Sequence, residues 1–299
     1  MLRSLLFRGN RSLIYDSSRG LSETVLSFKN VTFEYSALKP ILNNATFNVE
    51  EGRKVTIMGQ NGSGKSTLLK LINGKLTPQK GSINLKKGFA VSTALQVITP
   101  DDRKRTVLEF FTHYLHGTVS GIDGRIAAAL QKVKLTAPHS RLVGSFSGGQ
   151  QARLLLASAL IVEPDILLLD EPTNNLDVAG IEVLREMIVS SKKTVVVISH
   201  DEKFLNSFSD SVLYIDNHFK SVESYAGNYL FVKEEIAKRI ARENAENARL
   251  HKEAQQKKEQ ANVFAHKGGS MRKAAKKLKE QAIEIQSAKV VVRKEDREL

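Results

Sequence analysis

The sequence predicts an α/β domain with a parallel core sheet, an antiparallel β subdomain and a helical subdomain, followed by an extended α-helical hairpin. Three observations carry this prediction. Continuous apolar runs at residues 55–58, 166–169 and 194–198 are typical of buried parallel strands. Alternating apolar residues precede the first run. After residue 228 the chain becomes rich in Lys, Glu, Gln and Ala, which favour helices exposed to solvent.

We divide the chain into three segments. Residues 1–24 contain four Arg and several Ser but no clear apolar stripe, which favours a disordered or weakly ordered extension over an organellar transit peptide. Residues 25–228 form the α/β domain. Residues 229–299 form a charged helical hairpin.

Composition limits the classes of partner. The 299 residues carry a net charge of +13, which favours a polyanion, with nucleic acid first and an anionic membrane surface second. The sequence has no Cys, which excludes disulfides and thiolate metal sites and suits a reducing compartment, so we expect a cytoplasmic protein. The longest apolar stretch, residues 154–162, is too short to span a membrane.

Alternating apolar residues predict half-buried antiparallel strands ahead of residue 55. The apolar positions are Val25, Leu26, Phe28, Val31, Phe33, Tyr35, Ala45, Phe47 and Val49. Tyr35 ends one of these strands. A later alternation predicts a second pair of strands, which leads to Gln96. Its apolar positions are Ile83, Leu85, Phe89 and Val91.

A glycine-rich segment, Gly59 to Thr67, follows the apolar run at 55–58 and opens an amphipathic run. Glycines let the backbone fold tightly enough for successive N–H groups and a helix N-terminus to face one anion. Lys65 adds a positive charge and Ser66 offers a hydroxyl to Mg²⁺, so a nucleoside triphosphate is the fitting ligand. A chain of this length matches the pattern by accident about one time in a hundred, so a turn that binds nothing is disfavoured.

Helix signals dominate the middle of the chain. Gly74 can cap the helix that follows the glycine-rich segment. Thr106 to Glu109 match a capping box, and residues 124–130 are strong helix formers. Another apolar helix, 152–161, follows Phe146 to Gln150, where a serine and two glycines can present amides to an anion. That last signal is weak alone, because Ser-Gly-Gly is ordinary loop composition.

Charged residues follow two of the apolar runs. Asp170 and Glu171 come directly after residues 166–169, and His200 follows the run at 194–198 by one residue. Ligands of α/β sheets bind at the carboxyl ends of the strands, which favours a binding role over a solvated acidic turn. A lone histidine at a strand end is usually structural, so His200 gains interest only from its neighbours.

Together these segments resemble the ATP-binding cassette superfamily, from about Leu26 to Asp216. The resemblance implies that the domain binds and hydrolyses ATP with Mg²⁺. Phe146 to Gln150 is similar to the family's Leu-Ser-Gly-Gly-Gln signature, with Phe in place of Leu. For the nucleotide, the resemblance implies stacking on an aromatic and contacts with the glycine-rich loop. The implied residues are Tyr35, Gly59, Asn61, Gly62, Ser63, Gly64, Lys65, Ser66 and Thr67.

The resemblance also implies roles for the polar residues at the strand ends. Asp170, Ser66 and Gln96 correspond to the residues that hold Mg²⁺. Glu171 corresponds to the glutamate that polarises the attacking water, and His200 to the histidine that senses the γ-phosphate, so the implied catalytic residues are Glu171, His200 and Gln96.

In the family, the signature binds ATP that is held by an opposite cassette. The residues that correspond to its serine and glycine are Ser147 and Gly149. The resemblance also implies nucleotide contacts at Gln150 and at Asp177, the last residue of a segment that is similar to the family's D-loop. One cassette is recognisable in the sequence, so we expect it to pair with a second cassette of a longer protein, another copy or another chain.

The tail predicts two antiparallel helices. The first runs from about Tyr229 to Val263, and a break at residues 267–269 separates it from the second. Steps of four and three residues give the second helix a narrow apolar seam, formed by Met271, Ala275, Leu278, Ala282 and Ile285. Six cations without an acid favour nucleic acid over a solvated face. They are Lys267, Arg272, Lys273, Lys276, Lys277 and Lys279.

A cassette followed directly by a charged helical pair resembles the ABC-F proteins, in which such a pair links two cassettes and reaches into the ribosome. Residues 170–177, Asp-Glu-Pro-Thr-Asn-Asn-Leu-Asp, are close to that subfamily's motif, with Asn175 in place of His. The resemblance implies a ribosome-associated ATPase, of which this chain holds the N-terminal cassette and linker. Two alternatives stay open: the ATPase subunit of a transporter, and a nucleotide-gated RNA-binding module with little turnover alone.

Overall fold

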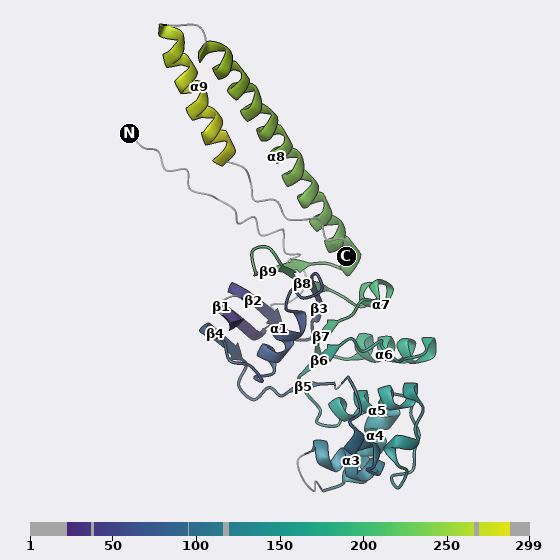
Figure 1. The fold of residues 1–299 in the computed structure, drawn as a ribbon. Helices are drawn as coiled ribbons and strands as arrows, with labels where there is room; N and C mark the ends of the chain where they lie inside the picture. The colour runs from purple at the N-terminus through teal and green to yellow at the C-terminus, as the bar shows by residue number, and fades with distance from the viewer. Residues whose placement is uncertain (1–22, 37–38, 95, 116–119, 266–268, 288–299) are drawn as a thin grey trace.

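The computed structural model describes residues 23–36, 39–94, 96–115, 120–265 and 269–287. Most of the predicted N-terminal extension lies outside these ranges, as does Lys267. The described chain forms an α/β domain with two sheets and a helical subdomain, from which a helical hairpin projects (Figure 1). The predicted fold class is therefore confirmed.

The smaller sheet is antiparallel and has the strand order β2-β1-β4. Its strands are β1 (Thr24–Ser36), β2 (Lys39–Glu50) and β4 (Lys80–Leu85). One face is buried, and the rings of Phe28 and Phe47 stack there with centroids 4.4 Å apart. The apolar alternation changes phase between Phe28 and Val31, where the register of β1 shifts.

The second predicted pair of strands is wrong as a pair. Strand β4 lies beside β1, whereas β5 (Val91–Thr93) belongs to the larger sheet and runs parallel to β6 (Ile166–Asp170). Phe89 lies between them in a turn, where its N–H donates to the carbonyl of Lys86 at 3.1 Å. Alternation reports which face of a strand is buried, but it carries no information about the strand's partner.

The larger sheet has the order β5-β6-β7-β3-β8-β9, parallel except for the edge strand β9. Its other strands are β3 (Lys54–Met58), β6 (Ile166–Asp170), β7 (Thr194–Ile198), β8 (Ser211–Asp216) and β9 (Ser221–Ala226). Strands β3 and β7 are buried throughout. Burial on both faces explains the continuous apolar runs. Because the strands are parallel, the carboxyl ends of β3, β6 and β7 lie together on one side of the sheet, here called its carboxyl edge.

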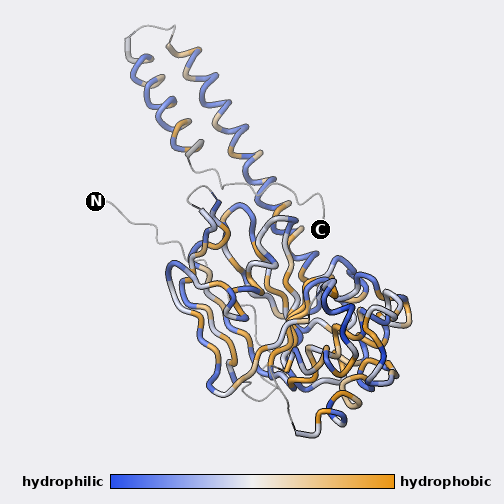
Figure 2. Tube along the Cα trace, turned by 60° about the horizontal axis from the view of Figure 1, so that its bottom comes forward, coloured by the Kyte–Doolittle hydropathy of each residue, from blue (hydrophilic) through white to orange (hydrophobic). Residues whose placement is uncertain are grey.

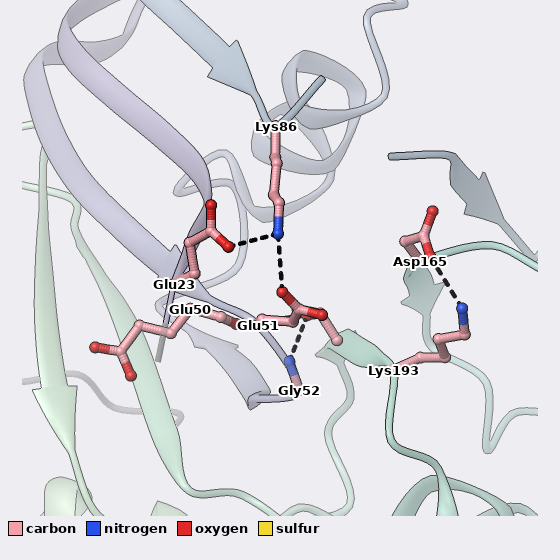
Figure 3. Close-up of polar contacts among 8 residues, drawn as sticks. Glu23, Glu50, Glu51, Gly52, Lys86, Asp165 and Lys193 are labelled. Carbon is pink, nitrogen blue, oxygen red and sulfur yellow. Dashed lines mark hydrogen bonds and ion pairs between the residues drawn. The ribbon is translucent and has the colours of Figure 1, made fainter. Parts of the chain in front are cut away.

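The opposite edge of this sheet, at the amino ends of the strands, is fastened by ion pairs (Figure 3). Lys86 donates to carboxylate oxygens of Glu23 at 2.7 Å and Glu51 at 3.1 Å, which joins the end of β4 to the turn before β3. Lys193 pairs with Asp165 at 2.9 Å, between the starts of β7 and β6. The Lys86 contacts tie the two sheets together, and the Lys193 pair ties two strands of the larger sheet, both away from the carboxyl ends.

Helices of the domain follow the predicted signals. They are α1 (Lys65–Ile72), α2 (Pro100–Arg103), α3 (Val107–Tyr114), α4 (Ile122–Lys132), α5 (Gly148–Leu160), α6 (Val178–Ser190) and α7 (Glu202–Asn206), with a 3₁₀ turn at Val143–Ser145. Thr106 and Glu109 form the predicted capping box of α3. Gly74 has φ +72° just past the end of α1. A glycine in this left-handed conformation commonly ends a helix.

Two hydrophobic cores lie on the two faces of the larger sheet. Leu167 and Leu169 of β6 face the helical subdomain, and Ile166 and Leu168 face α1 and the antiparallel sheet. Figure 2 shows the apolar residues gathered inside the domain, whereas the hairpin is mostly hydrophilic. The sheet is therefore held on both sides, and its carboxyl edge is a fixed platform.

The hairpin consists of α8 (Tyr229–Ala265) and α9 (Ser270–Ser287). At 1.5 Å per residue, the 37 residues of α8 extend about 55 Å. Its first turns bury Val232, Ile236 and Ile240 in the domain core. Farther out, the buried residues of the two helices are the alanines Ala254, Ala261, Ala275 and Ala282.

The predicted seam of α9 is correct at Ala275 and Ala282, whereas Met271 near the turn is 42% exposed. None of the helices in the described ranges is both long and apolar enough to cross a membrane.

Candidate functional site

The glycine-rich segment Gly59 to Thr67, here called the phosphate loop, connects β3 to α1. Gly64 is the N-cap of α1 with φ +106°, and a Cβ there would clash with Cγ2 of Ile41 on β2. Both the left-handed backbone and the close approach of Ile41 require glycine at this position. The first amides of α1 are thereby directed toward the loop.

The phosphate loop fits an anionic ligand. Lys65 Nζ donates to the loop's own carbonyls, Gly59 at 2.7 Å and Gln60 at 3.1 Å, so its charge is held over the loop. Ser63 Oγ is buried and has no hydrogen-bond partner among the described residues. A buried hydroxyl without a partner, beside a lysine and a helix N-terminus, is suited to a phosphate oxygen.

Asp170 and Glu171 stand at the carboxyl end of β6, at the same sheet edge as the phosphate loop. Gln96 reaches this place from the segment after β5, and its Nε2 donates to the carbonyl of Asp170 at 3.3 Å. The structure thus brings together three of the four residues predicted for metal and water, and the fourth, Ser66, lies in the first turn of α1 at the same end of the sheet. A carboxylate and an amide oxygen are ligands that Mg²⁺ accepts.

Glu171 has an unusual backbone for a residue other than glycine. Its φ is +51°, and its N–H donates to the carbonyl of Ile198 on β7 at 2.8 Å. Left-handed conformations of such residues cost about 1 to 3 kcal/mol and gather at functional sites. The neighbouring strand therefore holds the Glu171 backbone in place.

The Glu171 carboxylate lies against His200. The His200 N–H donates to Oε2 at 3.3 Å, and Nε2 of the ring lies 3.4 Å from Oε1. Oε1 is buried and accepts no hydrogen bond from the described residues. Thr173 and Ser199, whose hydroxyls are 3.0 Å apart, tie the two strand-end loops together. The pair therefore combines a fixed acceptor with a histidine side chain that is 64% exposed.

Tyr35, near the end of β1, lies next to the last residue of the phosphate loop. Its hydroxyl lies 3.3 Å from Thr67 Oγ1 on α1, and its ring meets Phe33 edge to face. Tyr35 is 51% exposed. One face of the ring can therefore stack on a base held above the loop.

The signature segment, residues 146–150, forms a separate group. Ser147 caps α5, and Gln150 completes a capping box with it. Phe146 is buried, and the guanidinium of Arg141 stacks on its ring at 4.0 Å. The ring in place of leucine therefore packs against Arg141 and takes no part in the capping box.

A hollow of about 580 Å³ opens in front of the signature segment. Ser147, Gly149, Gln150, Arg153, Asn175, Leu176 and Asp177 line it. The lining contains no residue of the phosphate loop. The predicted nucleotide contacts therefore fall into two groups, as a composite site between two cassettes requires.

Arg153 lines this hollow, although the sequence analysis did not predict it. From α5 its guanidinium donates to Asp177 Oδ1 at 3.1 Å, and the same oxygen accepts the Gly180 N–H at 2.9 Å. The Gly180 amide, and then Arg153, hold the pKa of Asp177 below its ordinary value. The signal available in the sequence was a basic residue on the helix that the signature opens.

Comparison with known proteins identifies the family of the domain. The sequence pattern of the family described as ABC transporter matches residues 42–174, which include the phosphate loop, the signature segment and Glu171. The chain belongs to the ATP-binding cassette superfamily. The cassette is 33% identical over 237 residues to "Probable ATP-binding protein YheS" of Escherichia coli K12, covering 70% of this chain and 37% of that protein.

A second relative is "ABC transporter F family member 2" of Arabidopsis thaliana. It is 34% identical over 242 residues, covering 79% of this chain and 34% of the relative. These relatives support membership of the cassette in the F subfamily. The chain spans little more than a third of their length.

Among solved structures, the cassette is similar to the dimeric ATP-binding cassette MJ0796 bound to ADP and Pi. The TM-score is 0.56 at 27% identity, over 67% of this chain and 98% of the other. Cassettes of this superfamily bind ATP with Mg²⁺ and form composite sites as dimers. The roles of single residues in this chain remain predictions.

Proposed function

We propose that this chain binds ATP with Mg²⁺, hydrolyses it in a site completed by a second cassette, and acts on the ribosome in the cytoplasm through its hairpin. The observation that carries the proposal is the meeting of Asp170, Glu171, Gln96 and His200 at the edge that holds the phosphate loop. The F-family relatives support it for the subfamily.

The residues divide the work of phosphoryl transfer. Lys65 and the loop amides hold the β- and γ-phosphates, while Ser66, Asp170 and Gln96 would hold Mg²⁺. Bound Mg²⁺ supplies neutralisation of charge on the phosphate oxygens. Glu171 accepts a proton from water or orients it through Oε1, and His200, which lies beside this carboxylate, senses the γ-phosphate. Tyr35 stacks on the base.

A second cassette is required because Ser147 and Gly149 line a hollow apart from the phosphate loop. They contact the nucleotide of the opposite cassette, whose own signature contacts ATP on this chain. Turnover therefore rises with the concentration of the partner cassette, and it is low in the isolated chain.

The hairpin presents its cations in an ordered way. Five of the six predicted cations lie in α9, all are exposed, and none forms an ion pair with a described residue. At 100° per residue, Arg272, Lys276 and Lys279 share one flank of the seam. The opposite face carries Lys273 and Lys277 together with Glu280 and Glu284.

The flank formed by Arg272, Lys276 and Lys279 is here called the basic row. It spans about 10 Å along α9 and contains no acid. On one strand of a duplex this length covers about three phosphates. We assign the RNA backbone to the basic row because Glu280 and Glu284 weaken the potential on the far face.

The test compares two triple variants with equal loss of charge. One changes the basic row to glutamine (Arg272→Gln, Lys276→Gln, Lys279→Gln). The other changes three exposed lysines on other faces (Lys252→Gln, Lys273→Gln, Lys277→Gln). Ribosome binding is measured by co-sedimentation across a salt titration. We expect the row variant to bind more weakly and to lose roughly 2 to 3 from the log–log salt slope.

ATP affinity should stay the same in both variants, because the hairpin shares no residue with the nucleotide site. Equal losses in the two triple variants would reject the basic row. If the unchanged protein does not bind ribosomes, the proposal that it acts on the ribosome is rejected. Isolation of the protein from membranes together with a permease would support the transporter subunit instead.

A further inference from the structure

Helix α7 connects the carboxyl edge of the larger sheet, where His200 lies, to the base of the hairpin. It begins two residues after His200, and Asp201 between them is its N-cap, with Oδ1 accepting the Phe204 N–H at 3.0 Å. At its other end, Asn206 Oδ1 accepts the N–H of Leu230 in the first turn of α8 at 3.1 Å. Glu202 forms an ion pair with Lys233, one turn farther along α8.

Apolar packing makes these two helices one unit. Phe204 and Leu205 of α7 are buried in the same core as Tyr229, Val232 and Ile236 of α8. Close-packed cores resist independent sliding of their elements. A displacement of α7 is therefore carried to the first turns of α8.

A second route leads from the phosphate loop. Asn217, in the turn after β8, donates from Nδ2 to the Gln60 side chain at 3.1 Å. The turn continues into β9, where Glu223 accepts from the Arg239 guanidinium of α8 at 2.7 Å. Both the γ-phosphate side and the loop side of the site thus reach the same helix.

We infer that α7 couples the state of His200 to the tilt of the hairpin, an inference that rests on ATP binding as proposed above. When His200 turns from Glu171 toward a bound γ-phosphate, Asp201 and the start of α7 follow. Asn206 and Glu202 pass this movement to Leu230 and Lys233. The long α8 enlarges it, since a tilt of about 5° moves a point about 28 Å from the base by about 2.4 Å.

Coupling of this kind needs a measured response to ligand, because contacts alone do not prove it. The sequence has no Cys, so two introduced cysteines are labelled without interference. Asn48→Cys on β2 and Ala248→Cys on α8 are both exposed positions. Spin labels there report the distance from the antiparallel sheet to the hairpin by pulsed electron paramagnetic resonance, in the full chain with Mg²⁺ and either ADP or AMP-PNP.

We expect the distance to differ by roughly 2 to 3 Å between the two nucleotides. Glu202→Gln combined with Asn206→Ala should remove at least half of this difference, and His200→Ala should abolish it. Lys238→Gln is the matched control, because Lys238 pairs only within α8, with Glu234 and Glu235, among the contacts described. Exchange of the pair, Glu202→Lys with Lys233→Glu, should restore the response relative to Glu202→Lys alone.

Nucleotide affinity and thermal midpoint are measured for every variant, so a folding defect is recognised separately. If AMP-PNP binds and the distance does not change, or if the double variant responds as the unchanged protein does, α7 is not the coupling element and ATP binding still stands. If AMP-PNP does not bind at all, the proposed function falls, and this inference falls with it.

Discussion

The larger sheet has two edges in the sense used here, one at the amino ends of its strands and one at their carboxyl ends. Polar groups at the amino edge have hydrogen-bond or ion-pair partners, whereas some buried polar atoms at the carboxyl edge have no hydrogen-bond partner among the residues that the structure describes. At the amino edge, Lys86 and Lys193 are paired with carboxylates, and the buried Lys54 donates to the carbonyls of Gly52 and Lys193 at 2.9 and 2.7 Å. At the carboxyl edge, Ser63 Oγ and Glu171 Oε1 are buried without a hydrogen-bond partner in the described chain.

The difference separates stability from ligand binding. Satisfied polar groups at the amino edge stabilise the fold, whereas unmet acceptors and a left-handed carboxylate residue raise the free energy of the other edge until a ligand meets them. Substitutions should therefore change different quantities at the two edges, and three measurements can break or sharpen this comparison.

The largest effect is expected at Glu171. Glu171→Gln keeps the size of the side chain but removes the base, so ATP turnover should fall by about 10² to 10⁴-fold while ATP affinity changes little. Turnover is measured at concentrations where cassettes pair, and Glu182→Gln on the exposed face of α6 is the control. Turnover at the unchanged rate would remove Glu171 from the proposed chemistry.

An intermediate effect is expected at the amino edge. Lys54→Met keeps the apolar stem but leaves two carbonyls without their donor, which should lower the free energy of unfolding by about 2 kcal/mol. Urea unfolding measures it, and ATP affinity should not change. Lys193→Met is the matched control, because its ion pair is half exposed and contributes less than about 1 kcal/mol. Loss of ATP binding in Lys54→Met would show that the two edges are not independent.

The smallest effect concerns pH. Burial raises the pKa of Asp210 above its ordinary value of 3.8, against the opposing charges of Arg53 and Lys54. The folded state therefore binds this proton more tightly than the unfolded state. The stabilisation that this bound proton gives to the fold is lost as pH rises from 3.8 through the raised pKa. Asp210→Asn should remove this contribution. It is measured as the difference between the two proteins in urea unfolding from pH 3 to 6, and parallel pH profiles would contradict it.

Much of the fold could be predicted because its signals are local. The apolar runs of β3, β6 and β7 reflect burial on both faces, and the glycine pattern of the phosphate loop reflects the left-handed turn at Gly64. The candidate residues Asp170, Glu171 and His200 were found for the same reason, since each one lies at or just after the carboxyl end of a strand.

The rest depends on contacts between distant segments. Nothing in the alternation around Ile83 and Val91 shows that their strands belong to different sheets. Gln96 and Asp170 are 74 residues apart, and Arg153 and Asp177 belong to different helices and loops. Such pairings are decided by the packing of the whole domain, which period and composition do not record.

The alanines between the helices of the hairpin have a consequence for its motion. Ala254, Ala261, Ala275 and Ala282 bury one methyl group each, and a methylene-sized group contributes only about 0.8 kcal/mol. The base of α8, in contrast, is anchored by Val232, Ile236 and Ile240. Amide hydrogen exchange should therefore become faster along α8 from base to turn, through local openings that leave the domain folded. A hairpin of this kind can re-form its outer turns against the surface that it meets, while its root keeps the direction set by the cassette.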